Sequence, residues 1–308
     1  MKDIFTPRKG LAQNVAFLAV LAAVEAVLSL ILSFFPLASL FVTIFLPSVS
    51  ALAAILAEKK YLPVYVVGSS LLAVAFGLHD LASSLFYVVP AILSGALLGF
   101  FLSSRFDFGL AIFLSSLLNM GCAYLSLPIS KALTGIDFVE FALDLLGISS
   151  IEGIKDLVPA FFFAYGTAGT ALSSFFVIYL ARRIGIEDGD ERKWASFLVV
   201  ALGLAFSIVS LSINTVSLAW SFLLGAMALL LTLLSLSSVI KRNPWWLYAL
   251  LVVLEFGALF LFAFLSSGTE GKDGFAFLPV FFLPVGLFTL ISLALPYLGQ
   301  GPKMKGKA

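Results

Sequence analysis

Two carboxylates lie well inside apolar stretches of the sequence, Glu25 and Glu255. A charged side chain at the centre of a bilayer costs about 2.5–3.5 kcal/mol even on a lenient insertion scale, so such a residue usually faces a cavity or a partner. Each glutamate could therefore bind a ligand, a proton or a cation. The structural alternative is a protonated carboxyl group that hydrogen-bonds to a neighbouring helix.

Two further polar side chains could contact a substrate, His79 and Asn119. His79 is the only histidine and stands beside Asp80, where a solvated pair in a turn is the simpler interpretation. Asn119 could orient a substrate or hydrogen-bond between helices. With one histidine and one cysteine the usual His/Cys zinc cages are excluded, and the HExxH, GxSxG and Walker phosphate-loop motifs are missing from the sequence. We expect no catalytic residue, no metal, no cofactor and no enzymatic activity.

The composition predicts that the elements carrying these residues are membrane helices. Of the 308 residues, 61% are hydrophobic and 11% are charged, whereas about a quarter of residues are charged in soluble domains. A helix needs about 20 apolar residues to cross a bilayer. Apolar stretches of roughly this length cover residues 11–35, 38–57, 62–77, 81–103, 106–127, 158–181, 194–213, 216–240, 245–264 and 275–298.

The positive charges support this count. With the N-terminus in the cytoplasm, all but three of the 18 Lys and Arg residues fall in cytoplasmic loops, the exceptions being Lys131, Lys155 and Lys272. Lys and Arg collect on that side of a membrane. We therefore predict an all-α polytopic protein of the plasma membrane, with about ten transmembrane helices and both termini inside. A net charge of +1 argues against nucleic acid as a partner.

The most charged segment, residues 184–193, divides the chain. It separates a six-helix module, residues 1–183, from a four-helix module, residues 194–308. In the last apolar stretch Pro279 and Pro284 each remove a backbone hydrogen bond, which predicts a kinked helix.

An outer segment, residues 130–156, has its own pattern. Asp137, Glu140 and Asp144 recur at helical spacing with apolar residues on the other side, which predicts an amphipathic helix at the membrane surface. A second short helix is expected to begin at Ser149 or Ser150. The segment could be a lid over an outward-facing cavity or a linker that returns the chain.

The fourth apolar stretch resembles part of a known family. Tyr87, Pro90, Gly95 and Gly99, followed by Arg105, are similar to the PxxxxGxxxG-type fourth helix of the substrate-binding S components of energy-coupling-factor (ECF) transporters. The alanine steps of the first stretch resemble the face by which S components dock on their membrane coupling subunit; here they comprise Ala19, Ala23 and Ala26.

This resemblance covers about residues 11–183. It implies a six-helix S-component-like half, binding of a small molecule from outside, and a separate ABC-type ATPase with a coupling subunit as partners.

The whole chain, including Asn214, Gly225 and the turn at residues 241–246, resembles the YybS-like family of uncharacterised bacterial membrane proteins. The first half of that family is itself similar to S components. We therefore expect binding or transport of a small molecule, with candidate contacts Glu25, His79, Asn119 and Glu255. One alternative is a non-transporting membrane scaffold or envelope-assembly factor, which would have no ligand and would tolerate Glu25→Gln and Glu255→Gln. A third candidate is an ion-coupled secondary carrier, which would require a carboxylate whose neutralisation abolishes ion dependence; six and four helices do not halve evenly, which counts against the inverted repeat of such carriers.

Overall fold

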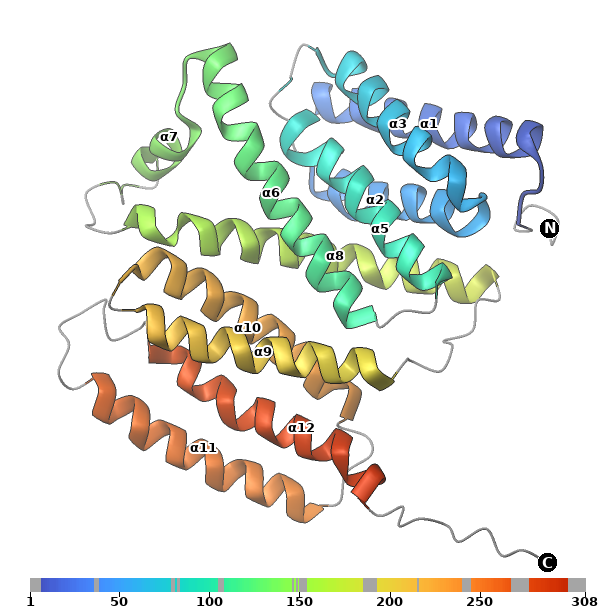
Figure 1. Cartoon of the computed structure of the whole chain (residues 1–308). Helices are drawn as coiled ribbons and strands as arrows, with labels where there is room; N and C mark the ends of the chain where they lie inside the picture. Colours follow the sequence, from blue (N-terminus) through green and yellow to red (C-terminus); the bar gives the residue numbers. More distant parts are fainter. Residues whose placement is uncertain are drawn as a thin grey trace, which may run out of the picture. The chain divides into compact units, whose positions relative to one another are not determined.

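The structure is a computed structural model that describes residues 7–35, 39–78, 81, 84–104, 108–145, 147, 149, 154–184, 193–214, 216–239, 245–266 and 277–298. Within these ranges all regular structure is helical (Figure 1). The chain divides into two compact units, residues 1–191 and residues 192–308. The boundary between the units falls inside the charged segment 184–193.

The first unit consists of seven α-helices and three short helical turns among the described residues. The α-helices are α1 (Leu11–Phe34), α2 (Ser39–Leu56), α3 (Leu62–Phe76), α5 (Val89–Ser103), α6 (Phe108–Thr134), α7 (Phe138–Leu145) and α8 (Val158–Ile184). The turns are the 3-10 helices η3 (Lys59–Tyr61) and η6 (Ile154–Leu157) and the π-helix η5 (Ser84–Val88).

The second unit consists of four α-helices in its described part: α9 (Lys193–Ile213), α10 (Leu218–Val239), α11 (Trp245–Ser266) and α12 (Phe282–Leu298). Each of the ten apolar stretches predicted from the sequence overlaps one of the α-helices of the two units.

Seven described helical segments are long and apolar enough to cross a membrane: Leu11–Ile31, Ser84–Ser103, Gly109–Thr134, Ile154–Ile184, Ser196–Ile213, Leu218–Leu236 and Phe277–Ala294. Two shorter apolar helical segments are Ile44–Leu56 and Leu251–Leu265. Helices suit this environment because each satisfies its own backbone hydrogen bonds where no water is available. The chain is a multi-pass, all-α membrane protein.

The closest helix contact in the first unit joins α2 to α5. A Cβ atom on Gly95 would lie 2.5 Å from the Cα of Pro47, and one on Gly99 would lie 2.7 Å from the Cα of Ala51. Real Cβ atoms do not approach other atoms this closely, so no larger residue fits at either position. The GxxxG pattern of α5 thus forms a packing face within the chain, as small residues do between membrane helices.

The other helices of the first unit surround this pair. Helix α1 packs beside α3 and against α2 (Figure 1), and α6 packs against both α5 and α8. Where α2, α3 and α5 meet, the core consists of Leu46, Ala73, Val88, Ala91 and Ile92. Helix α2 therefore contacts α1, α3, α5 and α8.

A polar contact fixes the start of α1 to the turn between α2 and α3. Glu58 Oε1 accepts hydrogen bonds from the backbone N–H of Gly10 (2.9 Å) and from Asn14 Nδ2 (3.3 Å). Asn14 Oδ1 in turn accepts one from the backbone N–H of Glu58 (2.8 Å), and Lys60 forms an ion pair with the same carboxylate. The first N–H groups of a helix have no partner within the helix, so Glu58 supplies one from outside it.

The outer segment is partly as predicted. Helix α7 is the expected amphipathic helix, but Leu143 is its buried residue, whereas Phe141 and Leu145 are exposed. Asp137 precedes α7 and accepts hydrogen bonds from the N–H groups of Val139 (3.2 Å) and Glu140 (3.3 Å), as an N-cap residue does. Residues 150–153, at the expected second helix, lie outside the described residues; the described turn is η6.

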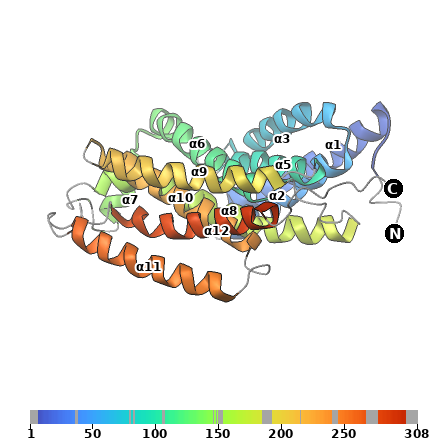
Figure 2. The ribbon, with the colours of Figure 1, turned by 60° about the horizontal axis from the view of Figure 1, so that its bottom comes forward.

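In the second unit, α9 and α10 form a hairpin. The hydroxyls of Ser210 and Ser221 each donate a hydrogen bond to the backbone carbonyl of the other, at 2.8 and 2.9 Å. Helix α12 packs against α9 and α10, and α11 lies beside α12 (Figure 2). The predicted kink stays a prediction, but the helix type changes where the prolines lie. Helix α12 begins at Phe282, so Pro279 lies in the 3-10 helix before it and Pro284 in its first turn. Proline is tolerated there because the missing N–H has no helical partner.

Candidate functional site

Within the first unit, the structure places Glu25 and Asn119 at different sites. Glu25 lies on α1, Asn119 on α6, and Glu255 on α11 in the other unit. His79 lies outside the described residues. Of the set, Asn119 is the residue that lines a cavity.

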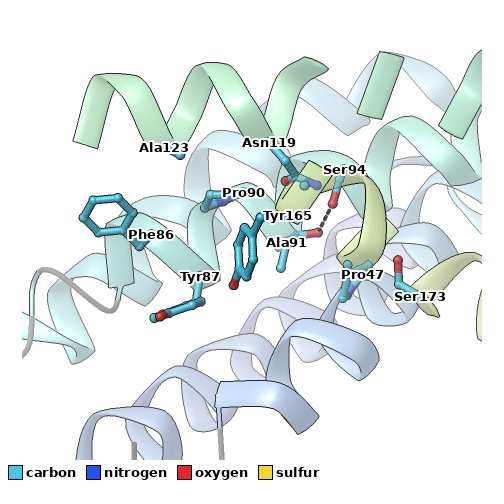
Figure 3. Close-up of a pocket in the computed structure, with 12 residues that line it drawn as sticks. Pro47, Phe86, Tyr87, Pro90, Ala91, Ser94, Asn119, Ala123, Tyr165 and Ser173 are labelled. Atoms are coloured by element: carbon cyan, nitrogen blue, oxygen red, sulfur yellow. Dashed lines mark hydrogen bonds between the residues drawn. The ribbon is translucent and has the colours of Figure 1, made fainter. Parts of the chain in front are cut away.

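This cavity lies inside the first unit between α2, η5, α5, α6 and α8, and we call it the central cavity (Figure 3). Its volume is about 30 Å³, enough for about two water molecules. It is lined by Pro47, Phe86, Tyr87, Pro90, Ala91, Ser94, Asn119, Ala123, Tyr165, Gly166, Gly169 and Ser173.

Asn119 is held in place by the neighbouring helix. Its Nδ2 donates a hydrogen bond to Thr170 Oγ1 on α8 at 2.9 Å. Helix α8 can approach because Gly166 faces Asn119: a Cβ added to Gly166 would lie 2.9 Å from the Cβ of Asn119. The interhelical role weighed for Asn119 is therefore present, together with a position on the cavity wall.

The remaining polar lining groups are hydroxyls. Ser94 donates to the Ala91 carbonyl at 3.2 Å and Ser173 to the Thr170 carbonyl at 3.0 Å. The Tyr165 ring extends from α8 towards Tyr87 (Figure 3). The lining includes no charged side chain. An apolar wall with a few amide and hydroxyl groups suits a neutral molecule that carries hydrogen-bonding groups.

Helix α7 is linked to this cavity through aromatic rings. Phe86 lines the cavity and its ring meets that of Phe138 on α7 edge to face, with centroids 6.2 Å apart. Movement of α7 would therefore alter a wall residue. A lid formed by α7 would move the cavity wall through this contact between Phe138 and Phe86.

A second, open hollow lies between α7, the C-terminal end of α6 and the 3-10 helix η6. Its volume is about 330 Å³, and its charged lining residues are paired: Lys131 with Asp137 and Lys155 with Glu140, each at 2.9 Å. The hydrogen bond from Lys131, followed by those from the backbone, holds the pKa of Asp137 below its ordinary value.

Glu25 is completely buried at a different place, where α1 meets α2 and α3. Ser50 Oγ donates a hydrogen bond to its Oε1. Glu255 is partly buried on α11 between exposed residues such as Val253 and Phe256. Among the described residues no hydrogen bond or ion pair to Glu255 is found.

The alanines expected to form a docking face point in two directions. Ala19 and Ala23 are exposed, whereas Ala26 is 4% exposed and faces the interior. Ala22 also packs inward, in a cluster with Leu18, Ala53 and Tyr65. A surface on α1 for another membrane protein therefore includes Ala19 and Ala23 but not Ala26.

Sequence reasoning did not assign Ser94, Tyr165 or Ser173 to a site, and it used Tyr87 only for a resemblance. One signal was available. Tyr165, Gly169 and Ser173 recur every four residues and so share a face of α8. Comparison of the chain with protein-family models, with curated proteins and with solved structures gave no match.

Proposed function

We propose that this integral membrane protein binds a small neutral molecule in the central cavity and takes part in its transport from outside the cell. The observation that supports this is the convergence of Asn119, Tyr87, Tyr165 and two serine hydroxyls on one cavity within a unit made of apolar helices. Packing alone does not require several polar groups at one place, because those that are buried, such as Ser94 and Ser173, must be desolvated.

Uptake would require the unit to open. The cavity of about 30 Å³ is far smaller than the roughly 300–1,000 Å³ of ordinary ligand pockets. A ligand would enter as α7 moves and Phe138 withdraws from Phe86, so this conformation is the closed one in our proposal. The free-energy cost of opening the unit would be offset by the free energy of ligand binding.

The proposal includes ten membrane helices with both termini inside, in the plasma membrane. It also includes an ABC-type ATPase and a coupling subunit that contacts Ala19 and Ala23. Support comes from the charge distribution and from the resemblance of residues 11–183 to S components. Fusions after residues 188 and 270 test the topology. We expect green fluorescent protein to fluoresce at the first position and alkaline phosphatase to be active at the second.

The binding test is extraction of small molecules from the purified protein, followed by mass spectrometry. Asn119→Leu removes a polar wall group, and we expect it to lose most of the retained compound. Thr170→Val is the matched control, because it breaks the same interhelical hydrogen bond without changing a lining residue. Equal retention by wild type and Asn119→Leu, or no compound besides lipid and detergent, would contradict the proposal.

The small volume of the cavity favours a second candidate, a non-transporting scaffold or envelope-assembly factor. Proteins that co-purify in mild detergent distinguish the two. Recovery of an ABC-type ATPase pair, lost in the Ala19→Leu/Ala23→Leu variant, would support the transport proposal. Recovery of cell-envelope proteins that bind residues 182–193 would favour the scaffold.

A further inference from the structure

Four oxygen-bearing side chains from three helices meet in the interior of the first unit. They are Glu25 of α1, Ser50 of α2, and Tyr65 and Ser69 of α3, and their exposed fractions are 0%, 0%, 5% and 1%. Glu25 stands in the middle of α1, which is one of the membrane-competent helices. The group is separate from the central cavity, whose lining includes none of these residues.

The hydrogen bonds of this group are incomplete. Ser50 donates to Glu25 Oε1, but Oε2 has no hydrogen-bond partner among the described residues. The hydroxyls of Tyr65 and Ser69 lie close enough to the same carboxyl group to interact with it, although neither has the geometry of a hydrogen bond with a described residue. Buried polar atoms almost always have a partner, so several unsatisfied oxygens at one point suggest a shared one.

We propose that Glu25, Ser50, Tyr65 and Ser69 bind a monovalent cation, Na⁺. Carboxylate and hydroxyl oxygens are the ligands that hard cations prefer. One carboxylate balances one positive charge, whereas a divalent ion would leave a net charge in apolar surroundings, at a large desolvation cost. The only other titratable side chain that faces the carboxyl group among the described residues is Tyr65.

This site goes beyond the proposed small-molecule binding and does not depend on it. The two sites use different residues of α2: Ser50 contacts Glu25, whereas Pro47, one turn earlier, lines the central cavity. A cation site could be present in a protein that transports nothing, and failure of one proposal leaves the other standing.

The test is binding of ²²Na⁺ to the purified full-length protein by scintillation proximity. We expect saturable binding of one ion per chain that is displaced by unlabelled Na⁺ and not by choline. Glu25→Gln, which keeps the size of the side chain, should abolish it. Tyr65→Phe, which removes one oxygen atom, should weaken affinity by about ten-fold or more, the effect typical of losing a group that supports a metal site.

Glu255→Gln is the matched control. It neutralises the other carboxylate of an apolar helix, which lies in the other unit, and should leave ²²Na⁺ binding unchanged. Circular dichroism and size-exclusion chromatography show that each variant is folded. Absence of saturable ²²Na⁺ binding to the folded wild type, or undiminished binding by folded Glu25→Gln, overturns the proposal.

Discussion

The contact between α2 and α5 gives the sharpest prediction, for the substitution Gly95→Ala. The new Cβ would lie 2.5 Å from the Cα of Pro47, about 1–1.5 Å inside the usual carbon–carbon separation of about 3.5–4.0 Å. The obstacle is the backbone of α2, so no rotamer change relieves the clash and the helices must separate. Inserting a methyl group into a close-packed interior typically costs about 1–3 kcal/mol.

For a unit of residues 1–191, this cost corresponds to a melting temperature lowered by about 2–12 °C. A thiol-reactive fluorescent dye measures it in detergent, because Cys122 on α6 is the only cysteine and reports on the first unit. All four tryptophans lie in residues 192–308, so their fluorescence follows the second unit separately.

The control is Gly68→Ala on α3, where an added Cβ would meet nothing within 4 Å. Replacing a helical glycine by alanine gains about 0.5–1 kcal/mol when space is free, so this variant should melt at or slightly above the wild-type temperature. If Gly95→Ala also melts at or above that temperature, α2 and α5 are not in close contact at Gly95 and Pro47, and the packing argument is refuted.

Three further results are expected. A double-mutant cycle of Asn119→Leu and Thr170→Val should give a coupling free energy of unfolding of about 0.6 kcal/mol, the average for membrane interhelical hydrogen bonds; zero coupling would mean that the bond does not form. The hydrogen bond from Lys60, and then that from the Gly10 N–H, holds the pKa of Glu58 below its ordinary value. Its stabilising contribution is therefore complete above the unfolded-state pKa and is lost as the pH falls through the lower folded-state pKa; wild type should lose more thermal stability than Glu58→Gln between about pH 5 and pH 3. Asp137→Ala removes the N-cap of α7 at a cost of about 0.5–2 kcal/mol, so hydrogen exchange of α7 should accelerate while that of α8 stays unchanged.

The sequence was sufficient to predict the helices but not their partners. Length and hydropathy predict where helices form, because a lipid environment leaves few other ways to satisfy the backbone. Asp137 and its neighbours predicted α7 by the same reasoning. The change of helix type before α12 was not predicted, since Pro279 and Pro284 are compatible with either a kink or a helix start, and only the packing of the chain decides between them.

The candidate site was less predictable. Glu25 and Asn119 could be chosen by residue type, because polar groups are rare in such helices. The hydroxyl groups around Glu25 and along the cavity could not be chosen in this way, since serine and tyrosine occur throughout the chain. The direction in which each side chain points depends on the rotation of its helix. Ala26 illustrates the same limit: it shares an alanine spacing with exposed residues, yet it is buried.

The position of α2 between two polar sites has a thermodynamic consequence. Ser50 contacts Glu25, and Pro47, one turn earlier, contacts the central cavity and the backbone of α5. If both sites bind as proposed, any shift of α2 that favours one ligand changes the affinity for the other. Linkage requires the effect to be mutual: the factor by which Na⁺ alters binding of the small molecule equals the factor by which that molecule alters binding of Na⁺. Helix α2, which contacts the glycines of α5 at Pro47 and Ala51 and the buried Glu25 at Ser50, would then act as an allosteric element rather than as a passive wall.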